Sequence, residues 1–167
     1  MHVFHMTEAK QNISSNPKDY EVLDCSSIDG PRRARLRREQ GRPLLFEKFE
    51  FCLLDDFNSF IAKDKLRALL VACGGSVVRS VAHMSFSRGA VCLAVVDNAH
   101  RGPRKEYLKI FRTQDVAVVD KDWVLESLGS YTIQPIMPWL QHNASEKEML
   151  KAGYDHKFLE EPLSCVL

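Results

Sequence analysis

The stretch DKDWVLESLGS, residues 120–130, combines a helix start, a helical apolar stripe and a glycine near its end. Asp120 is a favourable N-cap residue, so the stretch predicts a helix over residues 121–128 that stops at Gly129. Trp123 and Ser127 would lie on its inner face. No side chain in the stretch forms a catalytic group, and Trp123 needs a large apolar surface to pack against. The stretch therefore predicts a helix that packs on a sheet.

The glycine pair in VACGGSVV, residues 71–78, marks a second decisive point of the chain. Gly74 tolerates the left-handed conformation that ends many helices, so it predicts the end of a helix over residues 62–73. Gly75 would let the chain turn tightly into a short strand at residues 76–80. Apolar residues at helical spacing form the expected inner face of this helix: Leu66, Leu69, Leu70 and Cys73.

Apolar runs elsewhere complete a pattern of alternating strands and helices. Further strands are predicted at residues 46–54, 91–97 and 116–120, and another helix begins near Pro103. The order is strand, helix, strand, strand, helix, strand, helix. Because the strands are continuous apolar runs, they favour a parallel sheet covered on both faces. The predicted fold class is α/β, with a four-stranded parallel sheet flanked by helices.

The 167 residues suffice for one domain with extensions at both ends. Residues 1–42 are interpreted as a flexible polar and basic linker arm, residues 43–140 as the folded domain, and residues 141–167 as a C-terminal tail. The tail could form one amphipathic helix with Met149 and Leu150 on one face.

Composition narrows the function classes. The net charge is +1, and no run of 18 apolar residues predicts a membrane span. The N-terminus lacks the apolar core of a secretion signal. Five cysteines without metal-ligand spacing indicate small buried side chains in a reducing compartment, and three scattered histidines (His83, His100 and His142) also lack ligand spacing. No metal, cofactor or catalytic residue is predicted, so a small α/β enzyme is only a minor alternative.

A basic run stands out in DGPRRARLRREQGRP, residues 29–43. Its bracketing Gly-Pro and Gly-Arg-Pro sequences predict a linker with about one helical turn. A solvated arm is the plain interpretation, with nuclear import or contact with phosphates of DNA or a nucleosome as alternatives. Contact with nucleic acid is expected to be weak. The arginines concerned are Arg32, Arg33, Arg35, Arg37 and Arg38.

Two of these motifs carry a resemblance to a known family. CGGSVV at residues 73–78 and VVDKDWVLESL at residues 118–128 resemble the two most recognisable parts of a BRCT domain. The resemblance covers residues 43–140. It implies a non-enzymatic protein-interaction domain, with Gly74, Gly75 and Trp123 as structural residues.

A second resemblance concerns the linker. YEV at residues 20–22, GPRRARLRREQ at residues 30–40 and LF at residues 45–46 resemble the linker between the two BRCT repeats in the family of the breast-cancer susceptibility protein and its RING-domain partner. The linker is nearer the RING-domain partner, whereas VVDKDWVLESLGSY is nearer the susceptibility protein, and both assignments stay open. The resemblance implies a second repeat from a nuclear DNA-damage scaffold, whose parent could belong to a RING ubiquitin ligase.

The resemblance also implies positions for partner contacts. In the family, the first repeat holds the phosphate of a phosphoserine peptide, and the acceptors Asp55 and Asp56 in this chain would repel phosphate. Ile61 and Leu125 would form one apolar wall of the peptide groove, unless they are ordinary packing residues. The expected partners are a phosphorylated protein or chromatin, and the first repeat. Surplus apolar residues on the first and last helices would pack on that repeat, self-associate, or be covered by linker or tail: Leu66, Leu69, Leu70 and Leu128.

Overall fold

A computed structural model describes residues 30–57, 60–84, 89–97 and 104–163. The predicted roles of Pro103 and His100, and the YEV part of the linker resemblance, lie outside these ranges. No helix in the described ranges combines the length and apolar character that a membrane crossing requires.

The predicted sheet is confirmed. Its strands are β1 (Phe49–Leu53), β2 (Ser76–Val78), β3 (Val91–Val96) and β4 (Ala117–Asp120), all parallel in the order β2-β1-β3-β4. Each strand is shorter than its apolar run. The run at residues 46–54 is shortened the most. The Phe46 N–H donates to the Cys73 carbonyl, so Phe46 lies in a turn before β1.

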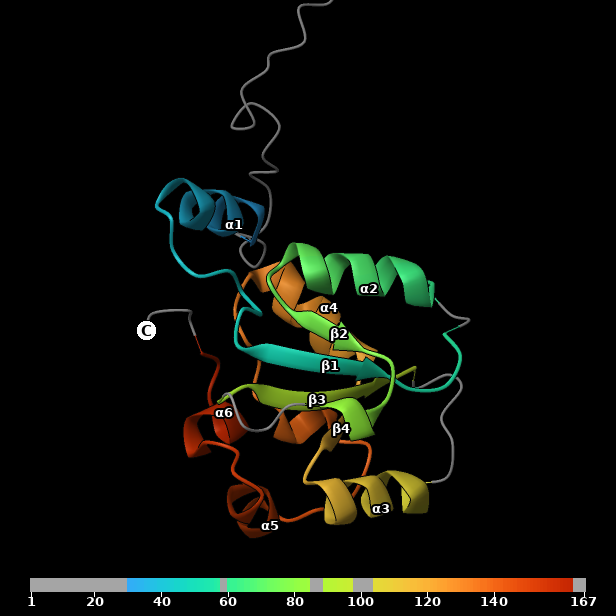
Figure 1. The fold of residues 1–167 in the computed structure, drawn as a ribbon. Coiled ribbons are helices and arrows are strands. Elements are labelled where there is room, and N and C mark those ends of the chain that lie inside the picture. The colour runs from blue at the N-terminus through green and yellow to red at the C-terminus, as the bar shows by residue number, and fades with distance from the viewer. Residues whose placement is uncertain (1–29, 58–59, 85–88, 98–103, 164–167) are drawn as a thin grey trace, which may run out of the picture.

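Helices cover both faces of this sheet, as predicted (Figure 1). The helices α2 (Lys63–Ala72) and α4 (Lys121–Ser130) lie on one face, and α3 (Arg104–Gln114) lies on the other. Alternate strand residues point to opposite faces, so the core divides into two clusters. Phe51 and Leu93 belong to the cluster under α2 and α4, whereas Cys92 and Ala94 belong to the cluster that contains Tyr107 of α3.

Trp123 occupies the position predicted for it. Its side chain is fully buried, and its Nε1–H donates to the Gln134 carbonyl at 2.9 Å. Rings from three parts of the chain surround the indole, with centroids between 6.0 and 6.5 Å away: Phe46, Phe49, Phe51 and Phe158. The short helix α4 is therefore held on the sheet mainly by one aromatic anchor.

The glycine pair also behaves as predicted. Gly74 has φ +90°, and a Cβ on Gly75 would lie 2.9 Å from the Phe51 ring. Gly129 does not end α4, contrary to prediction. The helix continues to Ser130 and ends at Tyr131, which takes the left-handed conformation with φ +48°. The Asp120 cap is confirmed, because its side chain accepts from the Asp122 N–H.

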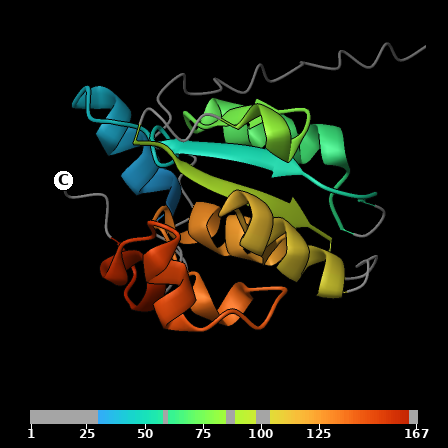
Figure 2. The same cartoon turned by 60° about the horizontal axis from the view of Figure 1, so that its bottom comes forward.

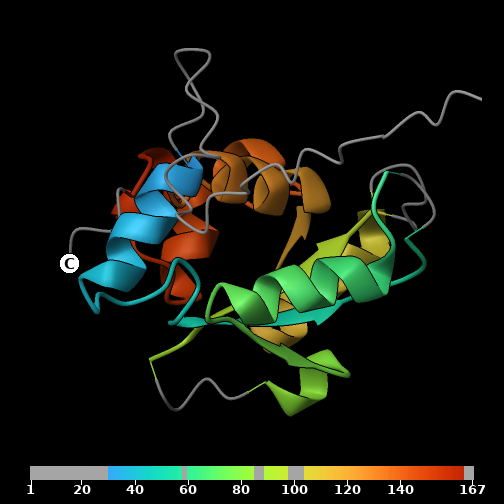
Figure 3. The same cartoon turned by 90° about the horizontal axis from the view of Figure 1, so that it is seen from above.

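The described part of the linker is more ordered than predicted. Instead of one turn it forms a ten-residue helix, α1 (Gly30–Glu39), which packs against α4. Figure 3 shows α1 lying beside α4 rather than over α2. Arg33 donates to Thr132 Oγ1 at 3.0 Å, just beyond the end of α4. The linker gains this order because the Gly30 backbone packs against α4 and the Arg33 side chain bonds to Thr132.

Residues 141–163 belong to the folded unit. It forms two short helices, α5 (Glu146–Lys151) and α6 (His156–Glu160), where the sequence predicted one, because Gly153 with φ +96° breaks the helix. Figure 2 shows both helices against the body of the domain. Met149 is buried but Leu150 is exposed, so they do not share a face. Five side chains of the segment join the core: Ala144, Met149, Tyr154, Phe158 and Leu159.

Two anchors hold this segment to the edge of the sheet. Leu140 bridges to Val119, and the Gln141 N–H donates to the Val118 carbonyl at 2.9 Å, so the edge of β4 is covered. The Tyr154 hydroxyl accepts from the Ala117 N–H at 2.7 Å and donates to the Cys92 carbonyl at 2.8 Å. Burial of this hydroxyl raises the pKa of Tyr154 well above its usual value.

Candidate interaction surface

The leucines of α2 separate into two groups. Leu66 and Leu70 are fully buried under the helix, whereas Leu69 is 41% exposed and its neighbour Val71 is 56% exposed. The prediction that Leu66 and Leu70 pack on another repeat is therefore wrong, because the chain's own core covers them. Leu69 lies on the outward face of α2 and is the part of the predicted surface that remains available, whereas Val71, two positions further on, is exposed at a different angle around the helix.

The groove residues lie on the same side of the sheet as that face. Ile61 precedes α2 and Leu125 lies within α4; both are half-buried and pack partly on the core cluster, as does Leu128. The partial exposure of Ile61 and Leu125 is compatible with a wall of the peptide groove and equally with ordinary packing. The sequence interpretation missed Phe60, which is next to Ile61 in the chain and 90% exposed. Nothing in the sequence indicated that this large apolar side chain before α2 would be exposed.

A carboxylate just after β1 is held in place by a hydrogen bond. Asp55 adopts φ +53°, and its Oδ2 accepts from the Tyr107 hydroxyl at 2.9 Å. Lys63 donates to the Asp55 carbonyl oxygen at 2.8 Å. The contact joins β1 to α3 and α2, and it keeps a negative group at this edge.

A buried ion pair fixes the neighbouring strand ends. Lys121 Nζ lies 3.2 Å from Asp97 Oδ1 and 3.1 Å from Asp122 Oδ1, with Asp97 fully buried. Burial alone would lower the pKa of Lys121, but the two carboxylates outweigh it and raise the pKa. The pair joins the end of β3 to the start of α4. Both carboxylates are engaged by the lysine, so the geometry indicates positioning rather than acid–base chemistry.

Most arginines of α1 form hydrogen bonds or ion pairs within the chain. Arg33 donates to Thr132, Arg35 forms a two-contact pair with Glu39 at 2.9 and 3.0 Å, and Arg37 Nε donates to the Pro43 carbonyl. Arg32 and Arg38 are exposed. The arm therefore anchors α1, and fewer than five arginines remain for phosphate. Nucleic-acid binding through the arm stays a prediction.

The histidines do not converge on one another where the structure describes them. His83 Nδ1 lies 2.6 Å from the Ser80 hydroxyl, and His142 is buried far along the chain. One group in the described ranges has metal-ligand chemistry: Glu146, His156 and Glu160, whose ligand atoms all lie within 4.8 Å of one another. They are partly or largely exposed, and His156 already pairs with both carboxylates.

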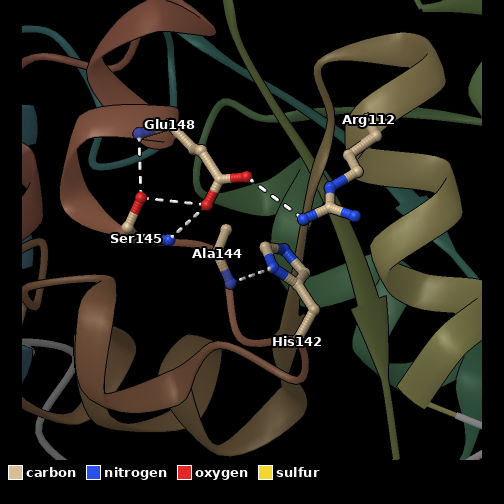
Figure 4. A network of polar contacts seen from close by, with 5 residues as sticks. All are labelled: Arg112, His142, Ala144, Ser145 and Glu148. Carbon is tan, nitrogen blue, oxygen red and sulfur yellow. Dashed lines mark hydrogen bonds and ion pairs between the residues drawn. The ribbon is translucent and has the colours of Figure 1, made fainter.

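His142 lies in a polar network between α3 and α5 (Figure 4). Its ring stacks on Phe111, and the N–H groups of Val118 and Ala144 point to its two ring nitrogens, each at 3.3 Å. A neutral imidazole has one acceptor nitrogen and the protonated ring has none. Burial lowers the pKa of His142 to about 4. Nearby, Arg112 contacts Glu148, which caps α5 with Ser145.

The family model described as the BRCA1 C Terminus (BRCT) domain matches residues 41–128. The chain is 30% identical over 123 residues to the mouse breast cancer type 1 susceptibility protein homolog, covering 74% of this chain and 6% of that protein. It is 25% identical over 150 residues to the Arabidopsis thaliana BRCA1-associated RING domain protein 1, covering 78% of this chain and 21% of that protein.

Among solved structures, the solution structure of the BRCT domain from human DNA repair protein REV1 aligns with a TM-score of 0.41 and 16% identity. The alignment covers 58% of this chain and 87% of that domain. The matched region of this chain thus spans a small part of its curated relatives.

Proposed function

The chain belongs to the BRCT domain family, and from this premise we propose that it acts as a non-enzymatic interaction module of a DNA-repair scaffold. It would supply the second half of a tandem BRCT unit that binds a phosphorylated protein or chromatin. The similarity to a breast-cancer susceptibility homolog and to a BRCA1-associated RING protein supports this proposal. Nuclear localisation and membership of a RING ubiquitin ligase complex belong to the same proposal.

The outward face of α2 is the observation that carries it. Leu69 and Val71 are exposed on a helix whose inner residues already fill the core, and Phe60, three residues before that helix, is 90% exposed. The proposal is that a partner covers these exposed apolar side chains. The first repeat would pack on this face, and Ile61 and Leu125 would form the second repeat's wall of the peptide groove.

Phosphate recognition would then lie outside this chain. The Asp55 carboxylate is held in place by the Tyr107 hydroxyl, so it cannot rotate away from the end of β1 without losing that contact. A dianionic phosphate next to it would be repelled. We therefore propose that this repeat binds the apolar side chain of the peptide and that the partner repeat binds its phosphate.

Peptide binding tests whether this repeat supplies the apolar wall of the groove and the preceding repeat supplies the phosphate site. Phosphorylated and unphosphorylated Ser-x-x-Phe peptides are titrated against this chain and against the same chain joined to a preceding BRCT repeat. The joined protein should prefer the phosphorylated peptide, and this chain alone should bind both forms weakly and equally. Ile61→Asp in the joined protein should weaken binding of the Phe-containing peptide at least about tenfold, since it places a charge in an apolar wall.

Asn143→Asp, at an exposed position outside α2, adds a single negative charge and is the matched control. A phosphate preference shown by this chain alone would overturn the assignment of the phosphate site to the other repeat. Failure of the joined protein to distinguish the two peptides would overturn the proposed function itself.

A further inference from the structure

Three side chains with metal-ligand chemistry meet where α6 lies beside α5 (Figure 1). Glu146 begins α5, and His156 and Glu160 stand at the two ends of α6, one helical turn apart. His156 Nε2 lies 3.2 Å from Glu146 Oε1 and 3.8 Å from Glu160 Oε2. The group lies beyond residues 41–128, which the BRCT family model matches, so the proposed function gives it no role.

The backbone already holds these three positions together. The residue before each helix caps it: Ser145 forms a capping box with α5, and the Asp155 side chain accepts from the Lys157 N–H of α6 at 2.9 Å. Met149 of α5 and Leu159 of α6 are fully buried, so both helices are fixed on the core. The three ligand side chains therefore need only small rotamer changes, rather than the folding of a loop, to close around an ion.

The distances and the donor types match a zinc ion. Zn²⁺ binds histidine nitrogen and carboxylate oxygen at about 2.0–2.2 Å in tetrahedral sites, which places neighbouring ligand atoms about 3.3–3.6 Å apart. The two distances from His156 Nε2, 3.2 and 3.8 Å, bracket that separation. An imidazole ligand favours zinc over Mg²⁺ and Ca²⁺, which prefer sites made of oxygen alone. The two glutamates supply the negative charge that a divalent cation neutralises.

We propose that Glu146, His156 and Glu160 bind one Zn²⁺ ion, with a water molecule in the fourth tetrahedral position. Three protein ligands and one water are the coordination of open zinc sites. The ion joins the start of α5 to both ends of α6, so it stabilises residues 141–163 against the rest of the domain. Glu146 is half-buried and the other two ligands are exposed, so zinc reaches them without any unfolding of the chain.

Calorimetric titration of the metal-free full chain with zinc chloride tests the site. His156→Gln should weaken zinc binding at least about tenfold, because losing a ligand costs at least as much as losing a hydrogen bond that orients one. Glu160→Gln should weaken it in the same way. Two controls should bind zinc as the parent does: His83→Gln removes an exposed imidazole elsewhere, and Glu161→Gln removes the neighbouring exposed carboxylate.

Two further measurements separate coordination from a general effect of the cation. Zinc at about 100 times its dissociation constant should raise the melting midpoint of the parent by about 5 °C or more, and that of His156→Gln much less. In NMR spectra, zinc should shift the ring signals of His156 and leave those of His83 in place. Circular dichroism of each variant without metal reports whether the fold is intact.

Three results would each overturn the proposal. A parent chain that binds no zinc has no site. Equal zinc binding by the parent and His156→Gln would place the ion elsewhere, for example on a cysteine thiolate. Displacement of zinc by an equal concentration of magnesium chloride would show that the carboxylates attract any divalent cation and that the imidazole is not a ligand.

Discussion

Gly30 at the start of α1 lies directly against Gly129 near the end of α4. A Cβ on Gly30 would lie 2.0 Å from the Gly129 carbonyl oxygen, closer than any real contact. The absence of a side chain at Gly30 lets the two helix backbones touch. Arg33 then reaches Thr132 at 3.0 Å and secures α1 beside the last turn of α4. A sequence expected to be a solvated arm is thereby built into the domain.

Gly30→Ala should displace α1 without unfolding the sheet. The added methyl group meets backbone rather than a movable side chain, so the helix must shift. Trypsin should then cut the arginines of α1 faster, while the thermal midpoint changes little. Gly129→Ala is the matched control, because its Cβ points into open space. That variant should keep α1 protected and gain up to about 1 kcal/mol from helix propensity. Equal cleavage of both variants would contradict the contact.

Aspartate substitutions on α2 should separate fold from association. Leu70→Asp places a charge in a fully buried site and should cost about 4 kcal/mol or more, unfolding the domain. Leu69→Asp and Val71→Asp lie on the exposed face and should leave the thermal midpoint nearly unchanged. If the chain self-associates through this face, sedimentation at several concentrations should show association lost in these two variants. A parent that is monomeric at every concentration would remove self-association and leave the partner repeat as the expected occupant.

Trp123→Ala should severely destabilise the domain. It removes the ring that four phenylalanines surround and the hydrogen bond to Gln134. The expected loss is about 3–5 kcal/mol, and each kcal/mol lowers the melting midpoint of a chain this size by about 2–4 °C. Circular dichroism melting provides the measurement, with Val71→Ala on the exposed face as control. A midpoint within about 3 °C of the parent would show that Trp123 is peripheral.

Acid should weaken the attachment of the C-terminal segment through His142. Its pKa falls from 6.5 to about 4 on folding, so the unfolded chain binds the proton more readily. Stability is then complete above about pH 6.5 and declines as the pH falls toward 4, by about 3 kcal/mol in total. Urea unfolding at pH 7, 5.5 and 4.5 measures this loss.

His142→Gln isolates the contribution, because glutamine keeps an acceptor for the Val118 N–H but does not titrate. Hydrogen bonds from the Ser145 backbone and hydroxyl lower the pKa of Glu148, so acid also weakens the α5 cap, but it does so in both proteins. The pH dependence of the parent should exceed that of the variant. Identical slopes would show that His142 titrates normally.

Much of the fold follows from local sequence pattern. Continuous apolar runs predicted a parallel sheet because both faces must be covered, and Gly74 and Asp120 predicted a helix end and a helix start from backbone chemistry alone. Trp123 was predicted as an anchor because a short helix has few other large side chains to bury. These features depend on neighbours a few residues apart, which a single sequence displays.

The tertiary structure decided which of the other side chains are buried, which form long-range contacts and which stay exposed. Helical spacing placed Leu69 beside Leu66 and Leu70, but only the position of α2 over the sheet determined that Leu69 remains exposed. Nothing local showed that Gly30 would meet Gly129 or that Tyr107 would bond Asp55, because each pair joins segments 52 or more residues apart. Residues 141–163 were likewise assigned to a tail, since their apolar side chains are sparse and find partners only once β4 presents an edge. The sequence determined the framework, and long-range packing decided which of its faces remain open to partners.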